Sequence, residues 1–203
     1  MAASVEPLVV GRVIGDVIDM FVPSVSMAVY YGPKHIANGC EIKPSMTINP
    51  PRILISGPCH ELFTLVMTDP DAPSPSDPTM RELVHWIVVN IPGGTNPTHG
   101  FLAQLHDSWY ISSCTKLEDT CHDKYDDTCG TSLCFHVDQF YATRGIHRFI
   151  FVLYKQKSEV NEVEQPEPRS NFSTRAFANN LDLGVPVATV YFNAQKEPAS
   201  RRR

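Results

Sequence analysis

Short apolar runs recur along the chain at intervals that are typical of a β-rich protein. Six of these runs are rich in valine, isoleucine, phenylalanine and tyrosine and are bounded by proline, glycine or asparagine. Residue types and boundaries of this kind predict β-strands. The predicted strands occupy residues 27–32, 52–56, 62–69, 83–91, 148–156 and 187–195. The pattern therefore predicts a mainly β fold.

The run at 83–91, LVHWIVVNI, is apolar at both alternating sets of positions. A strand with one face in water would alternate apolar and polar residues, so this strand is expected to be covered on both faces. The sheet that contains it therefore needs a layer on each side.

A single segment, NFSTRAFANNLDLG at 171–184, has the pattern of a helix. Ser173 or Thr174 can cap its first turn, and Phe177 and Leu181 form an apolar stripe with a spacing of i, i+4 that ends before Gly184. We expect this helix to pack against a sheet.

Composition favours one soluble domain. The chain has 203 residues, of which 42% are hydrophobic, and a formal net charge of −5. This length allows one well-buried core, and the many prolines and glycines fit the tight connections of a two-sheet sandwich. The mild acidity and the lack of a DNA-reading motif argue against direct nucleic acid binding. The amino terminus has no secretory pattern and no run could span a bilayer, so an intracellular protein with reduced cysteines is expected.

An acidic, proline-rich stretch, MTDPDAPSPSDP at 67–78, follows one of the predicted strands. Pro70 and Pro73 fix their own φ angles and restrict the residue before each of them. Asp69 is thereby held extended, and Asp71 lies between two restrained positions. The stretch is either an ordinary turn or a rigid part of a binding site.

Two histidines lie in strands that are otherwise apolar. His85 is inside the run at 83–91, and His147 stands just before the run at 148–156. Each alone could be a core histidine with satisfied hydrogen bonds. Together with a rigid acidic loop, two imidazoles can form a small pocket for a polar or anionic head group.

These motifs resemble one known family. DPDAPSPSDPTMRELVHWIVV, GIHRFIFVLYKQ and NFSTRAFANNLDLGVPVATVYFNAQ are similar to the phosphatidylethanolamine-binding protein family, in its plant branch. PLVVGRVIGDVIDMF, NGCEIKPSM and NAQKEPASRRR resemble the MOTHER OF FT type more than the FLOWERING LOCUS T or TERMINAL FLOWER types. The similarity covers residues 1–100 and 145–203.

The resemblance implies an antiparallel β-sandwich with a few short helices and an anion pocket at one edge. It places five residues in that pocket: Asp69, Asp71, Pro73, His85 and His147. It implies binding and regulation, without catalytic residues, cofactor or metal. The tyrosine that usually follows His-Arg in the family is replaced by Phe149, which removes one hydroxyl group from the expected pocket.

The segment 101–144 departs from the family pattern. The family has a much shorter connection there, with a turn that closes the pocket, and that turn is absent from this chain. A flexible insert within a single domain of residues 1–203 is one interpretation. An alternative splice form or a mistaken exon assignment is another.

A zinc site is a further interpretation of the same segment. It contains cysteines and histidines, which are suitable ligands, at positions Cys114, Cys121, His122, Cys129, Cys134 and His136. The spacing lacks the short C-x-x-C pair that makes a zinc prediction specific, so no metal is assigned.

The resemblance leads to three hypotheses about function. The first is a non-enzymatic regulator that joins transcription-factor complexes with bZIP proteins in the cytoplasm and nucleus, and controls seed germination or dormancy and flowering. The second is a monomeric module that binds a phospholipid head group or a small anion. The third, an inhibitor of kinases or proteases, has no specific support in this sequence.

Departures from the family pattern affect two details of these hypotheses, the 14-3-3 partner and the direction of the effect on flowering. His60 and His99 replace residues that florigens use to bind 14-3-3 proteins, although Pro92 agrees, so that partnership is weakly implied. Leu83 stands where the family's promoters and repressors of flowering differ, and it matches neither.

Overall fold

The computed structural model describes residues 5–97, 101–102, 144–161, 163 and 166–197. Its elements are, in chain order, α1 Glu6–Val10, α2 Val13–Asp16, β1 Met27–Tyr31, β2 Lys34–His35, β3 Cys40–Glu41, a 3-10 turn η1 Pro44–Met46, β4 Arg52–Ile55, β5 Leu62–Asp69, β6 Leu83–Pro92, β7 Phe101–Leu102, β8 Ile146–Lys155, α3 Thr174–Asn180 and β9 Pro186–Gln195. Each of the six predicted strands is present.

The strands form two sheets that pack face to face. The large sheet has the order β3-β9-β8-β5-β6-β7, and the small sheet has the order β2-β1-β4. All pairings are antiparallel except the short one between β3 and β9. Val29 and Ile53 of the small sheet share one buried cluster with Phe63, Phe151 and other residues of the large sheet. The predicted β-sandwich is therefore confirmed.

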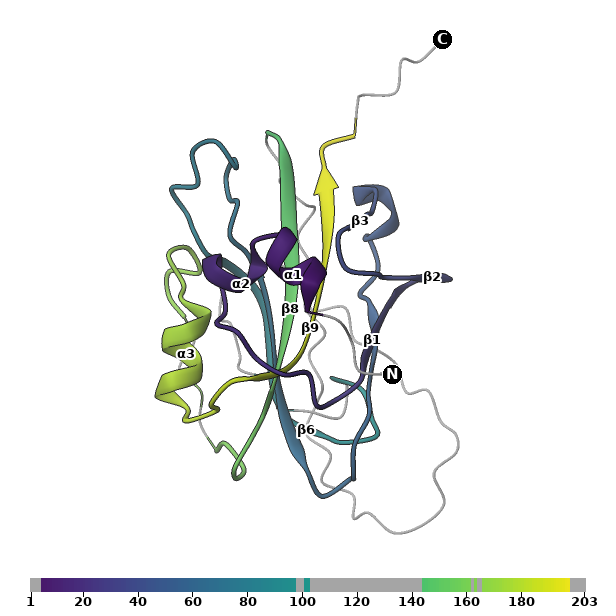
Figure 1. Ribbon diagram of the computed structural model, residues 1–203, viewed down its shortest axis with the longest axis vertical. Coiled ribbons are helices and arrows are strands. Elements are labelled where there is room, and N and C mark those ends of the chain that lie inside the picture. Colours follow the sequence, from purple (N-terminus) through teal and green to yellow (C-terminus); the bar gives the residue numbers. More distant parts are fainter. Residues whose placement is uncertain (1–4, 98–100, 103–143, 162, 164–165, 198–203) are drawn as a thin grey trace.

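The other face of the large sheet is covered by helices and loops. Leu8, Val13 and Ile18 from the amino-terminal segment pack with Ile150 and Val152 of β8. Figure 1 shows α3 on one side of β8 and β9, and the small sheet on the opposite side. Among the described residues, no helix is long and apolar enough to cross a membrane.

Strand β6 has apolar cover on both faces, as its sequence predicts. Trp86 and Val88 belong to the cluster between the sheets, whereas Val84, Ile87 and Val89 form a cluster on the helix side. Burial of both faces is what its uninterrupted apolar sequence requires.

Helix α3 also begins where the sequence predicts. The Ser173 side chain accepts a hydrogen bond from the backbone N–H of Ala176, 3.2 Å away, and so acts as the N-cap. Phe177 and Leu181 both pack against the buried cluster on the helix side of the large sheet. The apolar stripe therefore orients the helix.

Substitution of Phe192 provides a test of the packing in the core between the sheets. It is fully buried, and its ring lies 5.5 Å from that of Tyr31 and 5.3 Å from that of Phe149. We expect Phe192→Ala to lower the free energy of unfolding by about 3–5 kcal/mol, because it leaves a cavity. Denaturant unfolding followed by tryptophan fluorescence measures this. Val22→Ala, at a position that is 83% exposed, is the matched control and should change stability by less than about 0.5 kcal/mol. Equal effects of the two substitutions would contradict this packing.

Candidate functional site

An irregularity in β6 determines the position of His85. In the pairing of β5 with β6, Met67 lies opposite Trp86 and the next residue, Thr68, lies opposite Val84, so His85 is passed over. This is a β-bulge, which redirects a side chain away from simple alternation. The ring of His85 lies 5.4 Å from that of Phe149, which belongs to the cluster between the sheets.

His85 is held neutral in this position. Burial lowers its pKa to about 3, with smaller contributions from the positive charges of Arg169 and His147. Its Nε2 atom is buried and has no hydrogen-bond partner within the described part of the chain. The ring therefore offers an uncharged polar atom near neutral pH.

Asp69 ends β5 and organises the loop that follows. One carboxylate oxygen accepts a hydrogen bond from the backbone N–H of Asp71 at 2.7 Å, and the other lies 2.7 Å from Nδ1 of His147. Asp69 is 3% exposed. A short aspartate side chain that binds the backbone two residues further on favours a turn, and Pro70 between them fixes its own φ. The loop is thus built around the Asp69 carboxylate.

The surroundings of His147 favour its positively charged form. Its Nε2 atom lies 3.2 Å from the carbonyl oxygen of Arg144, and both of its ring nitrogens thus face acceptors. Two acceptors require two ring N–H groups, which only the imidazolium form has. Burial alone would lower the pKa of His147, but the hydrogen bond and charge of Asp69, followed by the Arg144 carbonyl and Asp71, raise it above its ordinary value.

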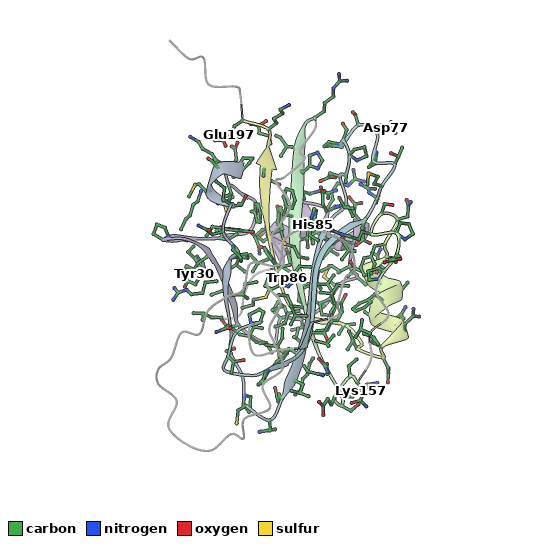
Figure 2. All side chains as sticks on the ribbon, turned by 180° about the vertical axis from the view of Figure 1, so that it is seen from behind. Tyr30, Asp77, His85, Trp86, Lys157 and Glu197 are labelled. Carbon is green, nitrogen blue, oxygen red and sulfur yellow. The ribbon has the colours of Figure 1, made fainter. Side chains whose placement is uncertain are left out.

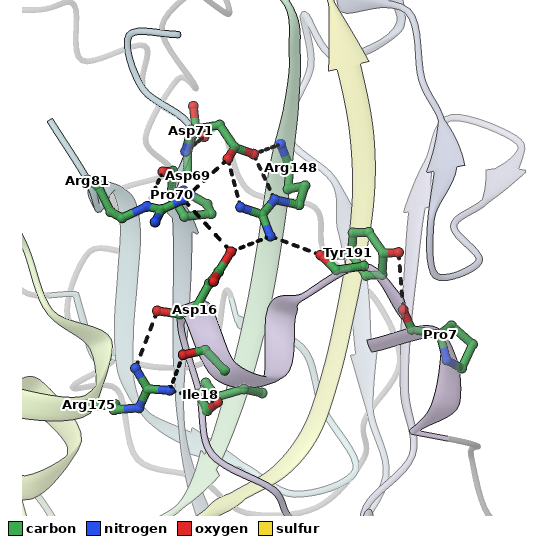
Figure 3. A network of polar contacts seen from close by, with 12 residues as sticks. Pro7, Asp16, Ile18, Asp69, Pro70, Asp71, Arg81, Arg148, Arg175 and Tyr191 are labelled. Carbon is green, nitrogen blue, oxygen red and sulfur yellow. Dashed lines mark hydrogen bonds and ion pairs between the residues drawn. The ribbon is translucent and has the colours of Figure 1, made fainter. Parts of the chain in front are cut away.

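Asp71 lies on the other side of the large sheet, where Figure 3 shows its carboxylate against Arg148. Arg148 donates from its Nε and from its second terminal nitrogen to the two carboxylate oxygens, at 2.8 and 2.7 Å. Its backbone N–H also donates to Asp71 at 2.9 Å. Both side chains are largely buried, with 14% and 6% of their surfaces exposed. This is a two-point ion pair with a third hydrogen bond from the backbone.

The same guanidinium group fastens the amino-terminal segment. Its remaining terminal nitrogen donates to the carbonyl oxygen of Gly11 at 2.9 Å and to the carboxylate of Asp16 at 3.0 Å. Nearby, Arg175 of α3 donates to the carbonyl oxygens of Gly15 and Ile18. Figure 3 shows these contacts around α2. Two arginines therefore hold this segment through its backbone carbonyl groups and the Asp16 side chain.

The five residues that the sequence places in one pocket are thus divided between two faces. Asp69, His85 and His147 lie toward the space between the sheets, and the structure brings Asp69 and His147 into contact. The carboxylate of Asp71 is bound on the helix side, and Pro73 follows in the loop, half-buried. That these residues line a ligand pocket stays a prediction.

Sequence reasoning missed Arg148 and Glu82. Arg148 adjoins His147 in an apolar strand, and a buried arginine needs a carboxylate partner, so this signal was available. Glu82, 5% exposed, accepts hydrogen bonds from the hydroxyl groups of Thr68 and Thr174 and so joins β5 to the start of α3. Burial raises its pKa, against the opposing effect of these hydrogen bonds. No spacing in the sequence indicates that contact.

Other residues singled out in the sequence lie in the core, at the surface or outside the described residues. Phe149 is buried and stacks on Phe192, and His60 is exposed. His99 and the candidate zinc ligands between Cys114 and His136 lie outside the described residues.

The Asp71–Arg148 pair gives a stability prediction. Arg148→Gln leaves the buried Asp71 carboxylate without its cation, and we expect the free energy of unfolding to fall by about 3–5 kcal/mol. Arg148→Lys keeps the charge but lacks the planar fork, so its loss should be smaller. Denaturant unfolding measures both. Arg12→Gln, at an exposed arginine, is the control. A loss from Arg148→Gln no greater than that of the control would contradict the assigned contacts.

The charge on His147 predicts a pH dependence with a definite sign. Because the pKa in the folded protein lies above the ordinary 6.5, the Asp69–His147 pair stabilises the fold fully below about pH 6.5. This stabilisation is lost as pH rises through the raised pKa. We therefore expect the difference in melting temperature between the wild type and His147→Gln to shrink as the pH is raised from about 6 into the alkaline range.

The exposed His60 supplies the control for this experiment. The wild type and His60→Gln should differ by the same small amount over the whole range, since His60 is exposed. A difference for His147→Gln that is constant or grows with pH would show that His147 is neutral in the folded protein.

Comparison with known proteins agrees with the motifs and the fold. A family model described as phosphatidylethanolamine-binding protein matches residues 33–192. The chain is 47% identical over 205 residues to "Protein MOTHER of FT and TFL1 homolog 2" of Oryza sativa subsp. japonica, with all of both chains covered. It is 41% identical over 200 residues to "Protein TERMINAL FLOWER 1" of Arabidopsis thaliana, with 98% of this chain and 96% of the relative covered.

Solved structures show the same fold at low sequence identity. A phosphatidylethanolamine-binding protein from Plasmodium vivax superposes with a TM-score of 0.66 at 19% identity and covers 97% of this chain and 99% of its own. A carboxypeptidase Y inhibitor, solved in complex with its cognate proteinase, gives a TM-score of 0.67 at 20% identity and covers 95% of each chain. The resemblance inferred from the motifs is confirmed, and the chain belongs to the phosphatidylethanolamine-binding protein family.

Proposed function

We propose that this chain is a non-enzymatic regulator that acts by joining transcription-factor complexes, with bZIP proteins as its partners. In this role it controls seed germination and dormancy and influences flowering, and it works in the cytoplasm and nucleus as a monomer. The observation that carries the proposal is its 47% identity to a MOTHER of FT and TFL1 homologue over the whole of both chains. A contact to 14-3-3 proteins is a weaker part of the proposal, because His60 differs from the family's usual residue there.

The site supports binding more than turnover. Asp69 and His147 are buried and bound to each other, and the remaining nitrogen of His147 faces a backbone carbonyl. A general base must be free to reach a proton on a substrate, and these groups are already engaged. His85, with a pKa of about 3, is too weak a base to hold a proton near neutral pH. These paired, buried groups are therefore suited to fixing the shape of a binding site and not to transferring protons.

Capture of partners tests the regulatory role. The full chain, tagged and expressed in seeds of a plant that lacks its own copy, is purified during imbibition and the bound proteins are identified. We expect bZIP proteins among them, and a changed germination rate compared with seeds that lack the chain. The buried substitution Phe192→Ala, which weakens the fold, is the matched control and should reduce both results. Seeds that germinate alike with and without the chain, and a purification without transcription factors, would overturn the proposal.

A second candidate function is the binding of a phospholipid head group or a small anion. The specific observation in its favour is the buried Nε2 atom of His85, which has no partner among the described residues and lies in the same core as the imidazolium of His147. A buried polar atom without a partner costs about 1–3 kcal/mol, and a ligand that binds it would remove this cost.

Calorimetry with soluble probes tests this candidate. The probes are inorganic phosphate, O-phosphoethanolamine and a short-chain phosphatidylethanolamine. Loss of the His85 contact in His85→Ala should weaken binding by about tenfold, the equivalent of one hydrogen bond to an ionised group. His60→Ala, at an exposed histidine, should leave binding unchanged. Binding that survives His85→Ala would exclude this site as the ligand position.

A further inference from the structure

Three side chains form a row across the outer face of the small sheet. Tyr30 of β1 lies opposite His35 of β2 and opposite Arg52 of β4, so the three residues are neighbours in register. The rings of Tyr30 and His35 are 5.0 Å apart, and the guanidinium carbon of Arg52 lies 4.9 Å from the centre of the Tyr30 ring. We call these three residues the cross-strand row.

The cross-strand row lies on the side of the small sheet that faces away from the core. Along β1 and β4 the buried residues alternate with more exposed ones, and Val29 and Ile53 point inward while Tyr30 and Arg52 point outward. Figure 2 shows Tyr30 at the margin of the molecule and His85 in its middle. The row is thus separate from the site around Asp69 and His147.

Arg52 differs from the arginines that hold the fold together. Arg81, Arg148, Arg169 and Arg175 each donate at least one side-chain hydrogen bond to a carbonyl or carboxylate oxygen. The guanidinium of Arg52 has no hydrogen bond or ion pair within the described part of the chain, and the residue is exposed. Stacking on Tyr30 orients its fork of donors without occupying them, since the contact uses the flat face of the group.

A purely structural role would not require the donors of Arg52 to stay open. Cross-strand pairs of this kind stabilise a sheet by about 0.2–1 kcal/mol each, and such packing needs only the stems and rings of the side chains. A fork of donors in a fixed position also lowers the entropy lost when an anion binds. Leu54, two residues further along β4 on the same face, is 42% exposed. An oriented cation and an exposed apolar side chain therefore lie next to each other.

We propose that the cross-strand row and Leu54 bind an extended acidic segment of a partner protein. An anionic side chain of that segment, carboxylate or phosphoryl, binds the Arg52 fork, and an apolar side chain two residues away packs on Leu54. The alternation fits, because residues i and i+2 of an extended chain point to the same side. The occupant is a peptide and not a membrane surface, because Arg52 and Leu54 lie two residues apart on one strand and match the side-chain spacing of an extended chain.

This inference rests on the proposed function, since a regulator that acts through partners needs such a surface. The two can nevertheless fail separately. A failed partner capture with intact peptide binding would overturn the regulatory proposal alone. Absence of peptide binding would overturn the present inference alone, because bZIP capture is measured independently.

Titration of the full isotope-labelled chain by NMR provides the test. The probe is acetyl-Thr-Glu-Thr-Leu-Thr-amide, with versions in which the glutamate is replaced by glutamine or by phosphoserine. We expect shifts at Arg52 and its strand neighbours, weaker binding of the glutamine version, and a roughly tenfold rise in Kd for Arg52→Gln. Arg52→Lys should give a smaller rise, because lysine lacks the fork. The glutamate and phosphoserine versions distinguish the two anionic groups.

Two substitutions of Tyr30 test whether the stacked ring is needed for binding. Tyr30→Phe keeps the stacked ring and should bind within about twofold of the wild type, whereas Tyr30→Ser removes the ring and should weaken binding. Arg12→Gln removes an equal charge from the amino-terminal segment and should have no effect, because a local contact is at stake and not the net charge. Melting temperatures establish that each variant is folded.

Three outcomes would overturn the inference. The first is equal affinity of the wild type and Arg52→Gln for the acidic peptide. The second is a set of shifts confined to residues away from the small sheet. The third is binding to vesicles of equal parts phosphatidylserine and phosphatidylcholine, lost in Arg52→Gln, without any binding of the peptides; that result would assign the row to a membrane surface.

Discussion

The ion pair between Asp71 and Arg148 determines how the edge of the large sheet is built. The pairing of β5 with β8 ends at Thr68 and Ile150, so the backbone N–H of Arg148 lies beyond the last strand partner. The carboxylate of Asp71 replaces the missing strand partner. It accepts hydrogen bonds from that N–H and from the guanidinium group. Burying two charges is costly, and the cost is offset only where the geometry is good and the other hydrogen bonds are made. Here Gly11 and Asp16 receive the remaining donor, which ties the amino-terminal segment to the same point.

This constraint separates two chemical environments that are adjacent in sequence. His147 and Arg148 are successive residues of β8 and therefore point to opposite faces of the sheet. Asp69 and Asp71 are two residues apart and would share a face if the strand continued. The turn at Pro70, closed by the bond from the Asp71 N–H to Asp69, sends the second carboxylate to the helix side instead. Of these four residues, one cation and one carboxylate therefore lie on each face, and movement of the loop would disturb both pairs.

The sequence predicted the parts of the fold that depend on local periodicity. The strands at 62–69 and 83–91 and the helix capped by Ser173 were recognisable because burial imposes a regular spacing on apolar residues. Helices α1 and α2 were not predicted, because they have five and four residues and Ile14 and Gly15 within α2 are not helical. Segments this short carry no periodic signal and are held by tertiary contacts.

The site was predictable in its residue types but not in its arrangement. Asp69 and His147 were both identified, yet their contact joins positions 78 residues apart and depends on strand pairing. The bulge at His85 could not be recognised in the sequence. A strand that is apolar on both faces has no alternation that an extra residue could interrupt. The face taken by Asp71 depends on the Pro70 turn and on Arg148 together. Long-range register and the choice of face are properties of the assembled sheet.

The distribution of charge indicates where each kind of recognition can occur. The imidazolium of His147 is already compensated by Asp69, and His85 is neutral, so the space between the sheets offers polar atoms with almost no net charge. Arg148 cannot add to it, because its fork is fully occupied on the opposite face. A ligand there would be held by hydrogen bonds more than by net charge, since the cation is already paired. Attraction of an acidic partner requires a cation with open donors, and on the small sheet Arg52 has that property. Recognition of a small ligand and of an acidic partner would therefore use opposite sides of the small sheet.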